Sequence, residues 1–101
     1  AVVMGHGRCG AVRAASDVVD RNVTFPGVIG RMIEPIIPAV LATRDKGSLD
    51  HAINENARRM AATLRADPVL AEKLADKKLD IVHARYDLDT GKATFFEDAV
   101  A

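Results

Sequence analysis

The spacing of hydrophobic residues predicts a strand, a loop and a helix at the start of the chain. Residues 1–4 form a short apolar run with two adjacent valines, which suits a buried strand of a parallel sheet. Three glycines within residues 5–10 interrupt this pattern, and apolar residues then recur at helical spacing over 10–20. The loop therefore follows the carboxyl end of a strand, which is where ligands bind in open α/β sheets.

The middle of the chain, residues 21–45, is apolar but contains three prolines. Proline removes a helical hydrogen bond and disfavours helical geometry in the residue before it. We therefore predict two short helices or one kinked helix, over about 26–34 and 36–44. The residues expected to pack inward are Ile29, Met32, Ile33, Ile36, Ile37, Val40 and Leu41. This aliphatic surface is large for so small a core and favours contact with a partner subunit.

Two further helices carry start signals of their own. Ser48 is a typical N-cap residue for a helix over about 49–65. Asp67 followed by Pro68 repeats the signal, with proline at the first helical position, for a helix that continues to about Lys78. The apolar residues that share one face of the first of these helices are Leu49, Ile53, Met60 and Leu64.

The last part of the chain predicts a hairpin. Residues 79–87 and 92–96 are typical of strands, and Asp89-Thr90-Gly91 between them is a turn signal. Gly91 is expected to take a positive φ in this turn. The whole order of elements, β-α-α-α-α-β-β, predicts an α/β fold with helices flanking a thin sheet.

The composition is that of an ordinary globular domain, with 49% hydrophobic and 28% charged residues in a chain of 101. Fourteen basic and fourteen acidic residues give zero formal charge, which argues against a nucleic-acid partner. No apolar run approaches the roughly 20 residues that span a bilayer, so no membrane partner is expected. A single cysteine, Cys9, excludes an internal disulfide.

The sequence Gly5-His6-Gly7-Arg8-Cys9-Gly10 carries the strongest chemical signal. Imidazole and thiolate are preferred ligands of zinc, and two intervening residues allow His6 and Cys9 to face one ion from a single turn. The N–H groups at a helix start also favour a negative charge such as a thiolate. The spacing alone leaves a second interpretation open, a buried free cysteine beside a loop histidine, because structural zinc needs four ligands.

The sequence Val2-Val3-Met4-Gly5-His6-Gly7-Arg8-Cys9-Gly10-Ala11 closely resembles the second metal-ligand motif of the β-class carbonic anhydrases. The likeness continues downstream, in the order and approximate spacing of that family, and covers nearly the whole chain from about Val2 to Phe96. The downstream segments that carry it are Pro35 to Val40, Asn56 and Tyr86-Asp87-Leu88-Asp89-Thr90-Gly91.

This resemblance implies reversible hydration of carbon dioxide to bicarbonate at a zinc ion held by two cysteines and one histidine. His6 and Cys9 would be two of these ligands, and the backbone N–H of Gly10 would face the substrate pocket. Zinc lowers the pKa of bound water to about 7, which gives hydroxide at neutral pH. The resemblance also implies part of the β-carbonic-anhydrase fold, with a parallel sheet, flanking helices and a C-terminal β-hairpin. A homodimer or higher oligomer is expected, since the family dimerises through apolar surface.

The family's first ligand motif, Cys-x-Asp-Ser-Arg, does not occur in the sequence, in which Cys9 is the one thiol. We therefore expect residues 1–101 to be a single partial domain, the carboxyl-terminal half of the enzyme, that begins inside the central strand. The missing amino-terminal half or a complementary chain would complete the site, and we expect no catalysis by this chain alone. His83 in place of the family's glycine, and Ala57 in place of its usual valine, lie outside the metal motif.

Other side chains leave alternatives open. Arg8 either attracts bicarbonate to the pocket or is a surface residue, and Tyr86 is favoured as a core residue over a catalytic acid. His51 is favoured as a solvated side chain. His83, on a predicted strand, is favoured as a packed or hydrogen-bonded residue over a third ligand or proton shuttle. No residue of this chain is assigned a catalytic role.

Two other functions stay open on the same scaffold. One is a hydrolase of carbonyl sulfide or carbon disulfide, and the other is a metal-free structural or interaction module, which the absent first motif favours. A reduced, metal-bound cysteine is compatible with the cytoplasm, where we expect the protein. The periplasm stays open, because a missing front half would hide an export signal.

Overall fold

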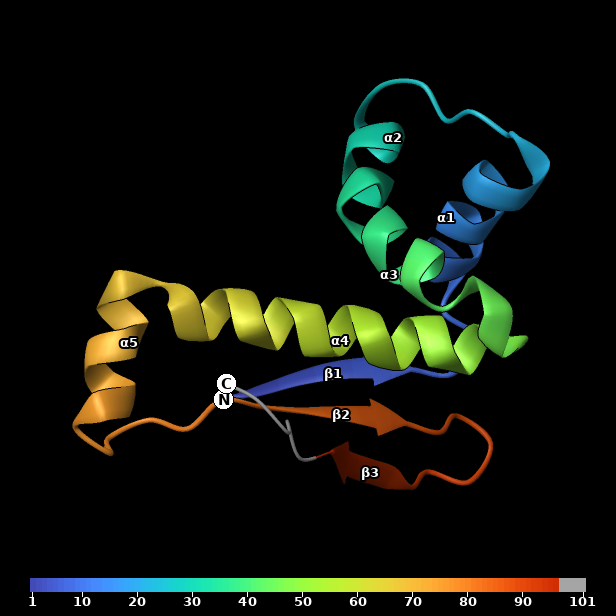
Figure 1. The fold of residues 1–101 in the computed structure, drawn as a ribbon. Coiled ribbons are helices and arrows are strands. Elements are labelled where there is room, and N and C mark those ends of the chain that lie inside the picture. The colour runs from blue at the N-terminus through green and yellow to red at the C-terminus, as the bar shows by residue number, and fades with distance from the viewer. Residues whose placement is uncertain (97–101) are drawn as a thin grey trace.

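In the computed structural model of the protein, which describes residues 1–96, three strands form one sheet in the order β1-β2-β3 (Figure 1). β1 (Val2–His6) runs parallel to β2 (Val82–Tyr86), and β2 pairs antiparallel with β3 (Ala93–Phe96). The carboxyl ends of β1 and β2 therefore lie at the same end of the sheet, next to the turn between β2 and β3. The predicted α/β fold class and the C-terminal hairpin are confirmed.

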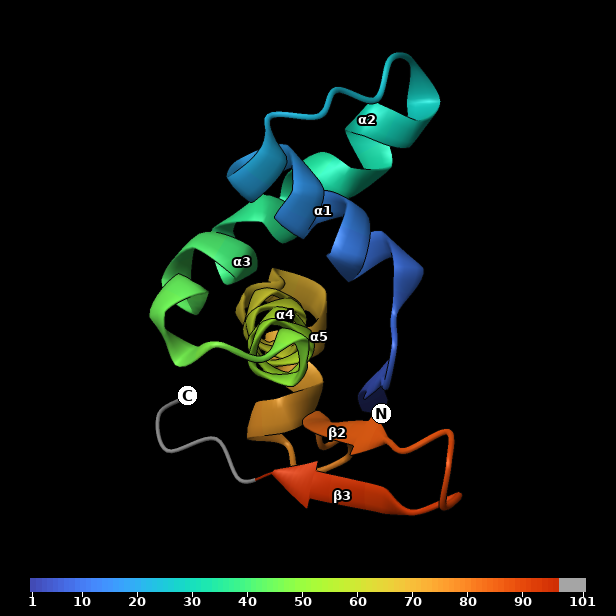
Figure 2. The same cartoon turned by 90° about the vertical axis from the view of Figure 1, so that its right-hand side faces the viewer.

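α4 forms one layer against the sheet and α1, α2 and α3 form a second layer beyond it (Figure 2), while α5 lies crosswise at the far end of α4 (Figure 1). α4 lies along β1 and β2, and α1 and α3 pack against the side of α4 that faces away from the strands. No helix within residues 1–96 is long and apolar enough to cross a membrane. The helical elements are α1 (Gly10–Arg21), α2 (Val28–Ile33), η1 (Glu34–Ile36), α3 (Ile37–Ala42), η2 (Arg44–Lys46), α4 (Leu49–Ala66) and α5 (Pro68–Ala75).

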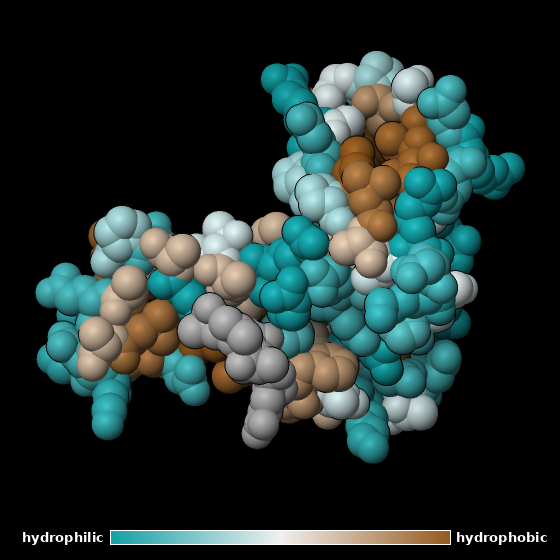
Figure 3. Space-filling model, viewed as in Figure 1, coloured by the Kyte–Doolittle hydropathy of each residue, from teal (hydrophilic) through white to brown (hydrophobic). Residues whose placement is uncertain are grey.

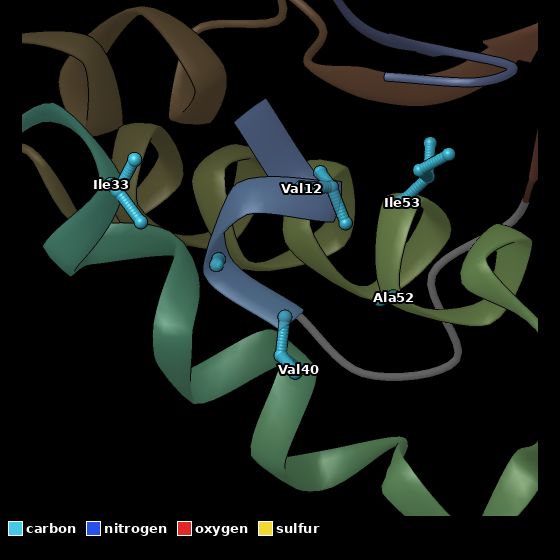
Figure 4. Packing of buried hydrophobic residues seen from close by; sticks show 6 residues of the cluster. Val12, Ile33, Val40, Ala52 and Ile53 are labelled. Atoms are coloured by element: carbon cyan, nitrogen blue, oxygen red, sulfur yellow. The ribbon is translucent and has the colours of Figure 1, made fainter. Parts of the chain in front are cut away.

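The hydrophobic core lies where α1, α2, α3 and α4 meet (Figure 4). Its buried residues are Val12, Ala15, Ile33, Val40, Ala52 and Ile53. Ile53 also contacts the sheet, since a Cβ added at Gly5 would lie 2.7 Å from Ile53 Cγ2. β1 can approach α4 this closely because residue 5 has no side chain.

The predicted start signals of α4 and α5 are confirmed by hydrogen bonds. The hydroxyl of Ser48 accepts a hydrogen bond from the Asp50 N–H at 3.2 Å. The carboxylate of Asp67 accepts hydrogen bonds from the N–H groups of Val69 and Leu70 at 3.0 and 3.3 Å. Each cap satisfies N–H groups that have no partner inside their own helix.

Some predicted boundaries were wrong. α5 ends at Ala75, earlier than predicted, because Lys77 has a positive φ of 60° that does not fit an α-helix. β1 continues to His6 instead of ending at Met4, because His6 pairs in register with Tyr86 on β2. His6 is therefore the last residue of a strand and not part of the loop.

The prolines divide the middle of the chain as predicted, with one at the start of η1 and one at the start of α3. The inward packing predicted for this segment was wrong for several side chains. Ile33 and Val40 are buried, but Ile29, Met32 and Leu41 are 59%, 69% and 51% exposed. These helices are one or two turns long and touch the rest of the chain on one side, so their other side stays uncovered.

Within residues 1–96, two apolar surfaces are exposed, in agreement with the excess of aliphatic residues noted in the sequence. The first is a groove of about 390 Å³ between the end of α1 and α2–α3, visible as a brown hollow in Figure 3. Its apolar lining residues are Val18, Val23, Phe25, Ile33 and Ile37. The second is the sheet face opposite α4, where Val2, Met4 and Phe95 are 49%, 48% and 60% exposed.

We expect Asp67→Ala to lower the free energy of unfolding by about 1 kcal/mol, because two N–H groups at the start of α5 lose their acceptor. Urea denaturation followed by circular dichroism measures this change. Glu72→Ala, at an exposed position of the same helix, is the control and should change the free energy by less than about 0.5 kcal/mol. Equal stabilities of the two variants would contradict the capping role.

Candidate metal site

The two predicted metal ligands lie at either end of one tight turn. His6 is the last residue of β1, and Cys9 is the N-cap of α1, with φ −62° and ψ 118°. Gly7 and Arg8 form the turn between them, at the carboxyl end of the parallel strand pair. The strand-to-helix junction therefore carries an imidazole and a thiol with two residues between them, as the sequence predicted.

The His6 side chain is exposed, and its Nδ1 lies 3.0 Å from the carbonyl oxygen of Gly7. With its proton on Nδ1, the ring donates this hydrogen bond and keeps the lone pair of Nε2 for a metal ion. Metal-binding histidines commonly have such a partner on their second nitrogen, because it fixes the tautomer and the ring orientation. In this tautomer the hydrogen bond to Gly7 orients the ring and leaves Nε2 accessible.

Cys9 is a free, half-buried thiol that packs against the hydrophobic core. Its carbonyl oxygen accepts the hydrogen bond of the Arg13 N–H at 3.0 Å, which starts the ladder of α1. The core therefore covers part of the side chain, and the rest of it stays accessible. Both earlier interpretations of this cysteine, a packed thiol and a metal ligand, are compatible with this position.

Gly10 is the first residue of α1 and is exposed. A Cβ added there would meet no atom of the chain within 4 Å. Its N–H is one of the first four of the helix, which have no acceptor inside the helix. The space beside Gly10 is open, and its role in substrate binding stays a prediction.

Two donors are all that the described residues bring to this turn. Among residues 1–96, no group of three or more His, Cys, Asp or Glu side chains could hold a metal ion. Imidazole and thiolate fit the ligand preference of zinc, but a catalytic zinc site uses three protein ligands. The turn therefore presents two residue types that zinc prefers, one fewer than a catalytic zinc ion uses.

His83 is a packed residue of the sheet, as favoured from the sequence. It is 4% exposed and stacks on Phe96, with ring centroids 5.3 Å apart and an interplanar angle of 21°. In the sheet it pairs with Val3, three positions before His6 on β1, which is about 10 Å along a strand. Because successive side chains of a strand alternate between the two faces, His83 lies on the sheet face of Val3, opposite to that of His6, which favours the packed role over the third-ligand role.

The structure also places the weaker candidates. His51 is exposed on the first turn of α4, and Tyr86, at the end of β2, is 37% exposed. Arg8 is a surface residue whose Nη2 lies 3.1 Å from Asp89 Oδ1. The sequence indicated Asp89 as part of a turn, but its ion pair with Arg8 was not predicted, since the two residues lie far apart along the chain and no local pattern connects them.

Comparison with known structures shows that this is the fold of the β-class carbonic anhydrases. Tetrameric β-carbonic anhydrases of Sordaria macrospora match with a TM-score of 0.83 and 18% identity, over 99% of this chain and 53% of theirs. The β-carbonic anhydrase CcaA matches with a TM-score of 0.78 and 18% identity, over 95% and 50%. The wild-type enzyme CafD of Aspergillus fumigatus matches with a TM-score of 0.67 and 21% identity, over 95% and 56%.

Comparison of sequences leads to the same family as comparison of structures. The family model for carbonic anhydrase matches residues 1–93, and the chain belongs to this family. Carbonic anhydrase 2 of Mycobacterium tuberculosis is 33% identical over 95 residues, which are 91% of this chain and 46% of that protein. The resemblance stated from the sequence is confirmed. The chain spans about half the length of these relatives, and its identity as a carboxyl-terminal half stays a prediction.

Proposed function

We propose that this chain supplies His6 and Cys9 to the zinc site of a β-class carbonic anhydrase, which hydrates carbon dioxide reversibly to bicarbonate. The observation that carries this proposal is the turn from β1 to α1, with an imidazole at one end and a thiol at the other. Membership of the carbonic anhydrase family supports it independently. In this proposal the residues of this chain bind zinc and substrate, and none of them acts as a catalytic acid or base.

The residues around the turn have distinct tasks in this proposal. His6 binds through Nε2 while the hydrogen bond between Nδ1 and the Gly7 carbonyl holds the ring. Cys9 binds as a thiolate at the start of α1, and the Gly10 N–H faces the space where the substrate binds. Zinc, when bound, supplies a hydroxide-strength nucleophile near neutral pH, because it lowers the pKa of water to about 7.

A further polypeptide segment has to complete the site, because a catalytic zinc ion uses three protein ligands. The greater length of the relatives is consistent with such a segment. β1 offers a place for it, since this strand lies at the edge of the described sheet and pairs with β2 on one side. Val2 and Met4 on the uncovered face of β1 would pack against the segment. We infer that the segment is the missing amino-terminal half or a complementary chain.

We also infer that the completed protein is a homodimer or a higher oligomer. Val28, Ile29 and Met32 on α2 are 63%, 59% and 69% exposed and together form an apolar patch of the kind that often marks a contact with another protein. The similar enzymes of Sordaria macrospora are described as tetrameric. A second copy of the chain that covers α2 would bury these side chains.

The proposal is tested by coexpression of this chain with an amino-terminal half that carries a cysteine and an Asp–Arg pair. We expect zinc close to one per complex, and carbon dioxide hydration in stopped-flow measurements, from the complex and not from this chain alone. Carbonyl sulfide, assayed on the same sample, separates the hydrolase alternative. Sedimentation equilibrium gives the number of copies in the complex.

The control is the same complex with serine in place of the cysteine of the amino-terminal half. It should assemble equally well but retain little zinc, since one ligand is lost. A well-assembled complex that contains neither zinc nor activity contradicts the proposal and favours a metal-free interaction module.

A further inference from the structure

The turn that carries the metal ligands rests on the turn between β2 and β3. The Gly7 N–H donates a hydrogen bond to the Tyr86 carbonyl at 2.9 Å, which extends the β1–β2 ladder beyond His6. The Arg8 guanidinium lies 3.1 Å from the Asp89 carboxylate. Both residues between His6 and Cys9 are therefore held from the same side, across a hollow of about 150 Å³.

The backbone of Arg8 is in an unusual conformation. Its φ is 54°, in the left-handed region that residues with a side chain rarely adopt. In so short a turn, this one angle strongly affects the direction in which the chain leaves His6 and reaches Cys9. A side chain that holds Arg8 in place therefore influences how the two metal ligands face each other.

The turn that presents Asp89 is itself well held. The Asp87 carboxylate accepts hydrogen bonds from the N–H groups of Asp89 and Thr90 at 2.8 and 3.2 Å. The Asp87 N–H donates to the Lys92 carbonyl at 2.8 Å, and the Gly91 N–H donates to the Asp87 carbonyl at 2.8 Å. Gly91 has the positive φ of 73° predicted for it. Asp89 thus extends from a fixed support.

We propose that Asp89 is a positioning residue for the metal turn, and that it acts through Arg8. By its ion pair with Arg8 it holds the turn in the conformation in which His6 and Cys9 bind one ion, without touching that ion. This inference rests on the proposed function, because it concerns the same ligand pair. It gives a role to the Tyr86–Gly91 segment, which the metal ligands leave unused.

The expected effect is moderate, because both partners are exposed and exposed ion pairs are weak. Apparent metal affinity scales with the fraction of molecules whose turn already has the binding conformation. Asp89→Ala is expected to lower the ratio of closed to open turn about threefold, within the range that exposed ion pairs give, so that the affinity falls by up to this factor. The effect should fade at about 1 M salt, where the screening length falls to about 3 Å.

The first test needs no metal. Amide hydrogen exchange of Gly7, followed by NMR in the full chain at low salt, reports how often the turn opens. Asp89→Ala should speed this exchange about threefold, and Asp89→Glu should restore most of the protection. Asp20→Ala is the matched control, because it removes an exposed ion pair of similar length, 3.2 Å to Arg44, at another place.

The second test titrates the same variants, each in complex with the amino-terminal half used above, with cobalt(II) and follows the thiolate-to-cobalt absorption band. Asp89→Ala should weaken binding by up to about threefold, while Asp20→Ala should leave it unchanged. Wild-type exchange and wild-type cobalt affinity in Asp89→Ala would overturn the inference. A wild-type complex without a cobalt band would instead contradict the proposed metal site, and the exchange rates would still decide whether Asp89 holds the turn.

Discussion

Cys9→Ser is expected to abolish metal retention by the complex of this chain with an amino-terminal half. A serine hydroxyl stays protonated at neutral pH and is a poor zinc ligand, whereas a thiolate is among the best. Loss of a residue that only hydrogen-bonds a metal ligand weakens metal binding by up to about 100-fold. Loss of the ligand itself should therefore weaken zinc binding by more than about 100-fold. Competition with a chromophoric chelator measures the zinc affinity.

Ala11→Ser is the matched control, because it introduces the same hydroxyl at an exposed position two residues further along α1. The control complex should keep its zinc. If Cys9→Ser also keeps zinc at unchanged affinity while the complex remains assembled, the ligand assignment is wrong, and Cys9 is then the packed thiol that its core contacts also allow.

Ile53→Ala should lower the free energy of unfolding by about 2–5 kcal/mol, the range for deletion of a buried isoleucine side chain. Ile53 is 2% exposed, belongs to the helical core, and its Cγ2 lies under Gly5 of β1. Its removal leaves a cavity where α1, α4 and β1 meet. Since the free energy of unfolding of a small domain is about 5–15 kcal/mol, this loss is a large share of the stability.

Urea denaturation with circular dichroism detection measures this loss. Ile53→Val removes one methylene and should cost about 0.5–1.5 kcal/mol, so it gives a result even where the alanine variant does not fold. Val69→Ala, at a position 71% exposed on α5, is the control and should have little effect. A similar small change in all three variants would show that the contact between α4 and β1 contributes little.

The features that could be predicted from the sequence depend on residues close together in the chain. Ser48 and Asp67 cap helices through N–H groups two or three residues away, and Gly91 takes its positive φ inside a tight turn. The spacing of His6 and Cys9 is of the same local kind, because a single strand-to-helix turn contains both.

The features that could not be predicted depend on what each residue meets in space. Met32 and Ile33 are adjacent and both apolar, yet one is 69% and the other 4% exposed, because this segment is covered on one side. The ion pair of Arg8 with Asp89 joins two ends of the chain, and it forms because β1 and β2 are neighbours in the sheet. Hydrophobic periodicity contains no information about either contact.

The position of β1 at the margin of the described sheet also affects how the isolated chain behaves. An edge strand exposes a row of unpaired backbone N–H and C=O groups, which can pair with a strand of another molecule. Here Val2 and Met4 add apolar side chains next to that row. Without a segment that covers this edge, purified chains are prone to stack strand against strand and to aggregate at high concentration.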